Sequence, residues 1–188
     1  MRFQYWVILF LSVFCSHSIN AQLNATTIGD AVNQGNNCYT ITQDLEFQSG
    51  GVWYDNPIDF DEDFSILYQN NFGSKDANGA DGMALVFKST AIPELGNAGG
   101  GLGYQGISPS LVVEFDTYLN NTPAEGLLAD PPFDHIAVMA NGNPNHGNPA
   151  ANLAGPVQAS PVSQNIEDGF THEIKIEWIA STTTFNVY

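Results

Sequence analysis

A short segment in the middle of the chain carries two carboxylates at a spacing that could hold a metal ion. This segment, Leu111 to Asn120 (LVVEFDTYLN), alternates apolar and polar residues as a β-strand does. The residues expected on one face are Glu114, Asp116, Tyr118 and Asn120, and those expected on the other are Val113, Phe115 and Thr117. Two carboxylates two residues apart on one face lie about 6.5–7 Å apart and repel each other. In a strand with the composition of a buried one, this pair is costly unless a cation compensates it.

Further residues that could bind a metal ion follow within the next fifteen positions. Asp130 comes ten residues after Asn120, and Asp134-His135 stands where the chain enters another alternating run. Carboxylates and carbonyls suit Ca²⁺, whereas a set that includes an imidazole suits a transition ion such as Mn²⁺. Two acids and an Asn are also common at a solvated strand edge, and a single His is more often a surface or hydrogen-bonded core residue. These residue types and spacings alone therefore leave a metal site and a solvated edge equally open.

The rest of the chain predicts an all-β fold that would carry these residues. Helical periodicity is almost absent, and short alternating runs are separated by Gly, Asn, Asp and Pro. The expected strands are Cys38–Ile41, Gly51–Tyr54, Phe64–Tyr68, Gly82–Lys88, Ser110–Tyr118, His135–Met139, His172–Ile179 and Thr184–Tyr188. The Gly/Pro/Asn/Ala-rich stretch from Asn141 to Ser163 is expected to be a long surface loop. Many short strands with long loops predict two packed sheets, in a sandwich or jelly roll.

Composition excludes several classes of partner. The chain has 20 acidic and four basic residues, a formal net charge of −16, and no basic cluster. Binding to nucleic acid or to an anionic membrane surface needs a Lys/Arg footprint, so neither is expected. Charged residues make up only 13% and hydrophobic residues 43%, which argues for a packed core rather than a charged, disordered tail. One domain is expected, because all-β domains of roughly 200–250 residues are common.

The N-terminus has the pattern of a secretory signal peptide. A basic start at Arg2 is followed by an apolar run from Tyr5 to Ser16, and the small residue Ala21 offers a cleavage site. The apolar run is shorter than the roughly 20 residues that a membrane span needs. We therefore expect residues 1–21 to be a signal peptide, and the mature protein to be secreted or on the cell surface without inserting in the membrane.

The mature domain, residues 22–188, has two further features. Its single cysteine, Cys38, cannot form an internal disulfide and is expected to be a buried residue of the first strand. The last residues, to Tyr188, have the pattern of a strand still in progress. We therefore expect the chain to be the N-terminal part of a longer surface protein, with the C-terminal strands of the domain missing.

The acidic segment, with Asp130 and His135 after it, resembles the metal loop of the L-type (legume) lectins. Four further motifs occur in the order found in that family: Val52-Trp-Tyr, Ala80-Asp-Gly-Met-Ala-Leu-Val-Phe, Gly99-Gly-Gly-Leu-Gly-Tyr and Asp168-Gly-Phe-Thr-His-Glu-Ile-Lys-Ile. Each motif alone is weak, but together and in order they are specific. The Asp134-His-Ile-Ala-Val run is similar to bacterial members, which are often modules of large surface proteins. The resemblance implies a concanavalin-like jelly roll of two antiparallel sheets that binds carbohydrate and depends on calcium.

The resemblance also implies two adjacent metal ions. Their ligands would be Glu114, Asp116, Tyr118, Asn120, Asp130 and His135. Glu114 and His135 would bind the transition ion, Mn²⁺ or another, and Asp116 and Asp130 would bridge both ions. The Tyr118 carbonyl and the Asn120 side chain would bind Ca²⁺. The turn before Asp130 is longer than in many plant members, so Asp134 is an alternative to Asp130.

The sugar contacts implied by the resemblance lie in three loops. Asp81, joined to Ala80 by a cis peptide, would accept hydrogen bonds from two neighbouring sugar hydroxyls. Gly100, with Gly101 as the alternative, would offer a backbone N–H, since glycine lets a ligand approach the main chain. The Asn120 amide would donate to the sugar, and the Tyr118 ring would stack on its apolar face.

Two other functions compete with this interpretation. Sandwich glycosidases of the laminarinase type carry Glu-x-Asp-x-(x)-Glu on one strand, and Glu114-Phe-Asp116 begins that pattern. The third acid would fall at Tyr118 or Leu119, and neither can transfer the proton, so we do not expect an enzyme. A structural adhesin domain, in which the ions only brace loops, remains the second alternative.

Overall fold

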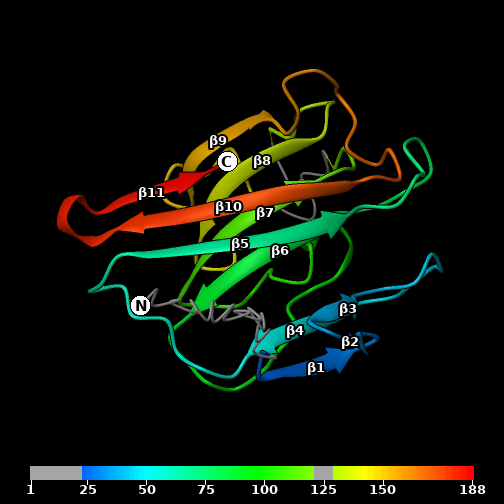
Figure 1. The fold of residues 1–188 in the computed structure, drawn as a ribbon. Coiled ribbons are helices and arrows are strands. Elements are labelled where there is room, and N and C mark those ends of the chain that lie inside the picture. Colours follow the sequence, from blue (N-terminus) through cyan, green and yellow to red (C-terminus); the bar gives the residue numbers. More distant parts are fainter. Residues whose placement is uncertain (1–22, 121–128) are drawn as a thin grey trace, which may run out of the picture.

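The protein folds almost entirely into β-structure (Figure 1). The computed structural model describes residues 23–120 and 129–188, so the expected signal peptide lies outside the described residues. The strands are β1 (Ala25–Gly29), β2 (Val32–Gly35), β3 (Cys38–Thr40), β4 (Gly50–Tyr54), β5 (Phe64–Asn71), β6 (Gly82–Lys88), β7 (Ser110–Asp116), β8 (His135–Ala140), β9 (Asn152–Gln158), β10 (Thr171–Ile179) and β11 (Thr184–Val187). Two short 3-10 turns, η1 (Gly99–Gly101) and η3 (Ala180–Thr182), complete them. In the described ranges no helix has the length and apolar character needed to span a membrane.

One antiparallel sheet, in the order β6-β7-β8-β9, carries the acidic segment on its second strand. β-branched and aromatic residues dominate β7 and suit a pleated, buried surface. The register places Gly82 of β6 on one side of Asp116 and His135 of β8 on the other. Strand pairing alone therefore brings the acidic end of β7 beside the first histidine of β8.

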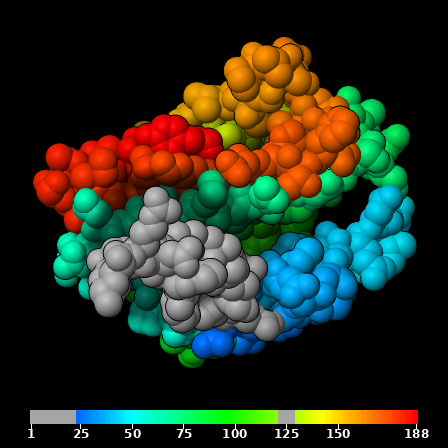
Figure 2. Space-filling model, in the orientation of Figure 1, coloured from blue at the N-terminus to red at the C-terminus, as the bar shows by residue number. Residues whose placement is uncertain are grey.

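A second sheet, in the order β11-β10-β5, packs against the first and closes a sandwich. In Figure 1 its strands cross over β6, β7 and β8, and in Figure 2 they form one continuous face, with β11 and β10 in red and orange beside β5 in teal. The buried residues between the sheets are Val113, Phe115, Ile166, Ile174 and Ile176. This architecture confirms the predicted all-β sandwich.

The opposite face of β7 is buried as well, because loops fold over it. The apolar residues buried there are Tyr104, Val112, Ala137, Met139 and Ala151. Tyr104 comes from the loop before β7 and Ala151 from the loop between β8 and β9. The polar side chains of β7 that point to this face are therefore removed from water.

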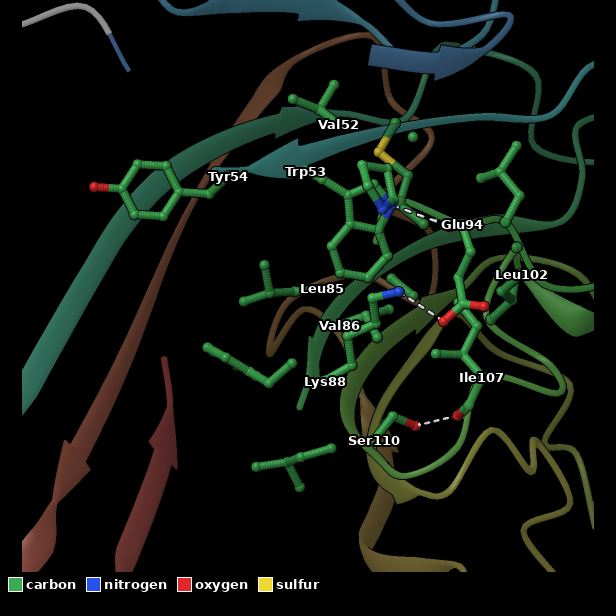
Figure 3. Close-up of a pocket in the computed structure, with 18 of the residues that line it drawn as sticks. Val52, Trp53, Tyr54, Leu85, Val86, Lys88, Glu94, Leu102, Ile107 and Ser110 are labelled. Carbon is green, nitrogen blue, oxygen red and sulfur yellow. Dashed lines mark hydrogen bonds and ion pairs between the residues drawn. The ribbon is translucent and has the colours of Figure 1, made fainter. Parts of the chain in front are cut away.

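Two small two-stranded sheets, β1–β4 and β2–β3, lie apart from the main sheets (Figure 1). A broad, mostly apolar hollow separates β4 from β6 and is lined by Val52, Trp53, Leu85, Leu102 and Ile107, among others (Figure 3). Lys88 is buried in its wall, where its Nζ lies 2.6 Å from Glu94 Oε1 and 4.6 Å from the centre of the Trp53 ring. The Trp53 indole N–H donates to the Glu94 carbonyl at 3.0 Å.

All eight predicted strands are present; β6 has the predicted ends, and each of the others differs at one end by one to three residues. Three strands were not predicted, and β9 lies inside the stretch expected to be a loop, so that expectation was wrong in part. Its Gly155-Pro156 pair is typical of a turn, but β9 is at the edge of its sheet, where a proline need not donate to the ladder.

The expectation for Cys38 was wrong. It is exposed and begins β3 rather than a first strand. Asn36 and Asn37 both have positive φ, 53° and 60°, and form the tight two-residue turn that joins β2 to β3. The sheet made by this hairpin has only two strands, so its first residue faces solvent.

Candidate functional site

Two carboxylates of β7 point away from the core between the sheets and are buried under loops. Glu114 is fully buried and Asp116 is 5% exposed. Their orientation opposite Val113 and Phe115 confirms the predicted alternation as far as Asp116, where the strand ends two residues earlier than expected. Burial, together with the negative charge of the nearby Asp130 carboxylate, raises the pKa of Asp116 to about 9. An ionised Asp116 thus requires a cation nearby.

The residues after β7 turn back toward these carboxylates. The Thr117 N–H donates to the Asp81 carbonyl at 2.9 Å, and the Tyr118 N–H donates to Asp116 Oδ1 at 2.9 Å. The Asn120 N–H donates to Asp130 Oδ2 at 2.5 Å. Burial raises the pKa of Asp130 to about 6, although this N–H opposes the change. Among the described residues, the buried Asn120 Oδ1 has no hydrogen-bond partner, as suits an oxygen that binds a cation.

His135 is oriented as a metal ligand would be. The Phe133 carbonyl can only accept, so His135 Nδ1, at 3.1 Å, carries the proton and donates to it. The Nε2 lone pair then faces Asp130 Oδ1 at 3.3 Å. Burial, together with the neighbouring His146, lowers the pKa of His135 to about 4. Ligand atoms of Asp116, Asp130 and His135 all lie within 4.8 Å of one another and could hold a metal ion.

A second histidine, His146, lies in the same place and was not predicted. It comes from the loop between β8 and β9, and its Nε2 contacts Glu114 Oε1. Glu114, His135 and His146 form a second group whose ligand atoms lie within 4.8 Å of one another. The Tyr104 hydroxyl, also unpredicted, donates to Glu114 Oε2. The only signal in the sequence was a second His eleven residues after His135, in a stretch without periodicity.

The two candidates for the acidic ligand after Asn120 lie in different surroundings. Asp130 belongs to the first group of ligand atoms described above. Asp134 instead accepts the Ile166 N–H at 2.6 Å and belongs to neither group. The geometry therefore favours Asp130 over Asp134 as a ligand.

The residues implied for sugar contact lie beside this cluster. The Ala80–Asp81 peptide is cis, as the family resemblance predicted. A side chain added at Gly99 would come within 3.9 Å of Asp81 Oδ2, so η1 lies next to the Asp81 carboxylate. The Gly101 N–H already donates to the Ala98 carbonyl at 3.3 Å, which favours Gly100 as the donor to a ligand. Tyr118 is 46% exposed and its ring is accessible from solvent.

Comparison with known proteins identifies the family of the chain. The model of the legume lectin beta-barrel domain matches residues 14–188. A pesticidal crystal protein of Bacillus thuringiensis, Cry22Aa, is 36% identical over 88 residues, which are 47% of this chain and 12% of that protein. The chain thus corresponds to a small part of that relative. Because the family model covers nearly the whole chain, the protein belongs to the L-type lectin family.

Proposed function

We propose that this domain binds carbohydrate and that Ca²⁺ and a transition ion hold its binding loops in place. The observation that carries the proposal is the pair of metal-ligand groups built on His135, directly beside the cis Ala80–Asp81 loop and η1. Buried carboxylates, an imidazole lone pair and a buried carbonyl oxygen meet there, which is the donor set of a mixed site.

The ligands divide between the two ions by chemistry. Glu114 and His135 would hold the transition ion, and the Tyr118 carbonyl and Asn120 Oδ1 would hold Ca²⁺. Asp116 and Asp130 would bridge them. When bound, the ions supply positive charge that compensates the buried carboxylates and fixes the loops. The raised pKa of Asp116 supports this assignment, because the carboxylate needs such compensation to ionise at neutral pH.

Sugar recognition would come from four groups around the ions. Asp81 would accept hydrogen bonds from two sugar hydroxyls, and the Gly100 and Asn120 N–H groups would donate hydrogen bonds to the sugar. The exposed Tyr118 ring would cover the apolar face of a pyranose. Since the Asn120 backbone bonds to Asp130, its position depends on the ion site.

Binding rather than hydrolysis is the function that these residues support. The second catalytic carboxyl group of the glycosidase pattern is missing, because Tyr118 and Leu119 occupy the positions where it would fall. A domain whose ions only brace loops is the remaining alternative. The N-terminal sequence supports a secreted or surface location, with glycans as partners in adhesion or recognition.

A glycan array with the full-length protein separates these functions. We expect binding to a restricted set of glycans in Ca²⁺ and its loss in chelator. Intact glycans should be recovered unchanged from incubation. An array without any signal in Ca²⁺ would favour the loop-bracing role, and shortened glycans would reveal hydrolysis.

A further inference from the structure

The site contains one imidazole more than the resemblance implies. His146 is 8% exposed, and its ring centre lies 4.9 Å from that of His135, with the planes at 79°. Its Nε2 contacts Glu114 Oε1 and its Nδ1 lies 3.5 Å from Asp130 Oδ1. Both ring nitrogens therefore face the carboxylates assigned to the transition ion.

We propose that His146 binds the transition ion directly through Nε2 and that the site selects Zn²⁺ over Mn²⁺. The inference rests on the transition ion of the proposed function but not on sugar binding. Imidazole is a ligand that suits Zn²⁺, whereas sites of carboxylate, carbonyl and water suit Mn²⁺. A second imidazole in place of an oxygen ligand therefore moves the preference of the site toward Zn²⁺.

The surrounding residues hold the donor atoms in the orientation that binding needs. Tyr104 binds Glu114 Oε2, which leaves Oε1 directed at His146. The Asn152 side chain donates to the His146 carbonyl at 3.0 Å, and the Asn145 N–H donates to Asn143 Oδ1 at 3.0 Å. The loop that carries His146 is thus fixed by its own hydrogen bonds. Such partners orient a ligand before the metal arrives.

A different role for His146 makes the opposite prediction. A protonated His146 could serve as the positive partner of Glu114 and Asp130 in place of a metal. It would then compete with the ion, and its removal would leave metal affinity unchanged or increase it. A direct ligand must instead lose its proton to bind, and its removal must weaken binding.

The test uses the full-length protein, stripped of metal, and titrates Zn²⁺ and Mn²⁺ by calorimetry. Wild type should bind Zn²⁺ more tightly than Mn²⁺, and by a wider margin than His146→Gln does, because most sites prefer Zn²⁺ to some extent. His146→Gln should lose at least about 100-fold in Zn²⁺ affinity, the upper end of the cost of removing an outer partner of a ligand. His172→Gln is the matched control, because His172 also pairs with a carboxylate, Asp168 at 3.1 Å, but lies outside the cluster. It should bind both ions as wild type does.

A spectroscopic count of ligands in the wild type adds a measurement that does not depend on whether the variant folds. With Cu²⁺ as the probe, electron spin echo spectra of the wild type should show two coordinated imidazoles, and those of His146→Gln one. A single imidazole in the wild type, or Zn²⁺ affinity in a folded His146→Gln equal to or above wild type, would overturn this inference alone. If the wild type bound no transition ion, this inference would be contradicted, and so would the two adjacent metal ions of the proposed function.

Discussion

Raising the pH should destabilise the metal-stripped protein, chiefly through Asp116. Burial raises the pKa of this carboxyl from 3.8 to about 9 in the folded protein. Between these two values the unfolded chain carries an ionised Asp116, so folding must take up a proton. The free energy of unfolding therefore falls as the pH rises through this window, and it stops falling above the folded pKa.

From about pH 7.5 to 9 the contribution of Asp116 to this loss is roughly 2 kcal/mol, since each pH unit is worth about 1.4 kcal/mol for one group. The folded pKa values of His135, Asp130 and Glu167 are about 4, 6 and 7, below the range. Burial lowers the pKa of His146, but the Glu114 carboxylate outweighs it and the net shift is upward. A raised histidine pKa gives stability that is lost with rising pH, which adds to the effect of Asp116.

Urea denaturation in chelator, monitored by tryptophan fluorescence at about pH 7.5 and pH 9, measures this loss in the free energy of unfolding. Asp116→Asn should lose most of the pH dependence and should be more stable than wild type at the higher pH. With metal bound the sign reverses, because deprotonated ligands bind the ion better. Equal stability of the stripped wild type at both pH values, or the same loss in Asp116→Asn, would refute the reasoning.

Three further predictions concern the ions and the loop before Asp81. Chelation should lower the melting temperature by about 5–10 °C for each ion that had been held near 100 times its Kd, and added Ca²⁺ should restore it; an unchanged melting curve would count against a metal site. His135→Ala should reduce the bound transition ion more than Ca²⁺ in metal analysis, and full retention of the transition ion would contradict its role. Gly79→Ala should lower the free energy of unfolding, measured by urea denaturation, by about 1–3 kcal/mol. The added Cβ would come within 2.1 Å of Glu167 Oε1 and 2.2 Å of the Lys75 carbonyl oxygen. A free energy of unfolding equal to that of wild type would show that the loop can shift.

Strands with a clear local pattern of apolar residues could be predicted from the sequence, and strands defined by their neighbours could not. β6 has the predicted bounds, because an unbroken apolar run follows Gly82. β9 was missed because its residues resemble a turn, and only its pairing with β8 makes it a strand. Cys38 was misplaced because its apolar character says nothing about whether a second sheet covers it.

Some residues of the candidate site could likewise be predicted from the sequence, and others could not. Glu114 and Asp116 could be found because two-residue spacing on one strand is a local property. Their proximity to Asp130 and His135 could be expected from the family resemblance. His146 and Tyr104 reach Glu114 from loops on either side of β7 in the sequence, 32 and 10 residues away, so their proximity is tertiary and leaves no periodic signal.

The most direct test of the carbohydrate-binding claim is calorimetric titration of the best array ligand into wild type, Asp81→Asn and Asp116→Asn, with metal analysis of each. A hydrogen bond to a charged group is worth about 1.5–3 kcal/mol, so Asp81→Asn should lose at least about tenfold in affinity and keep its metal. Asp116→Asn should lose metal and sugar binding together. If Asp81→Asn bound the ligand as tightly as wild type, the sugar would lie elsewhere and the account would be contradicted.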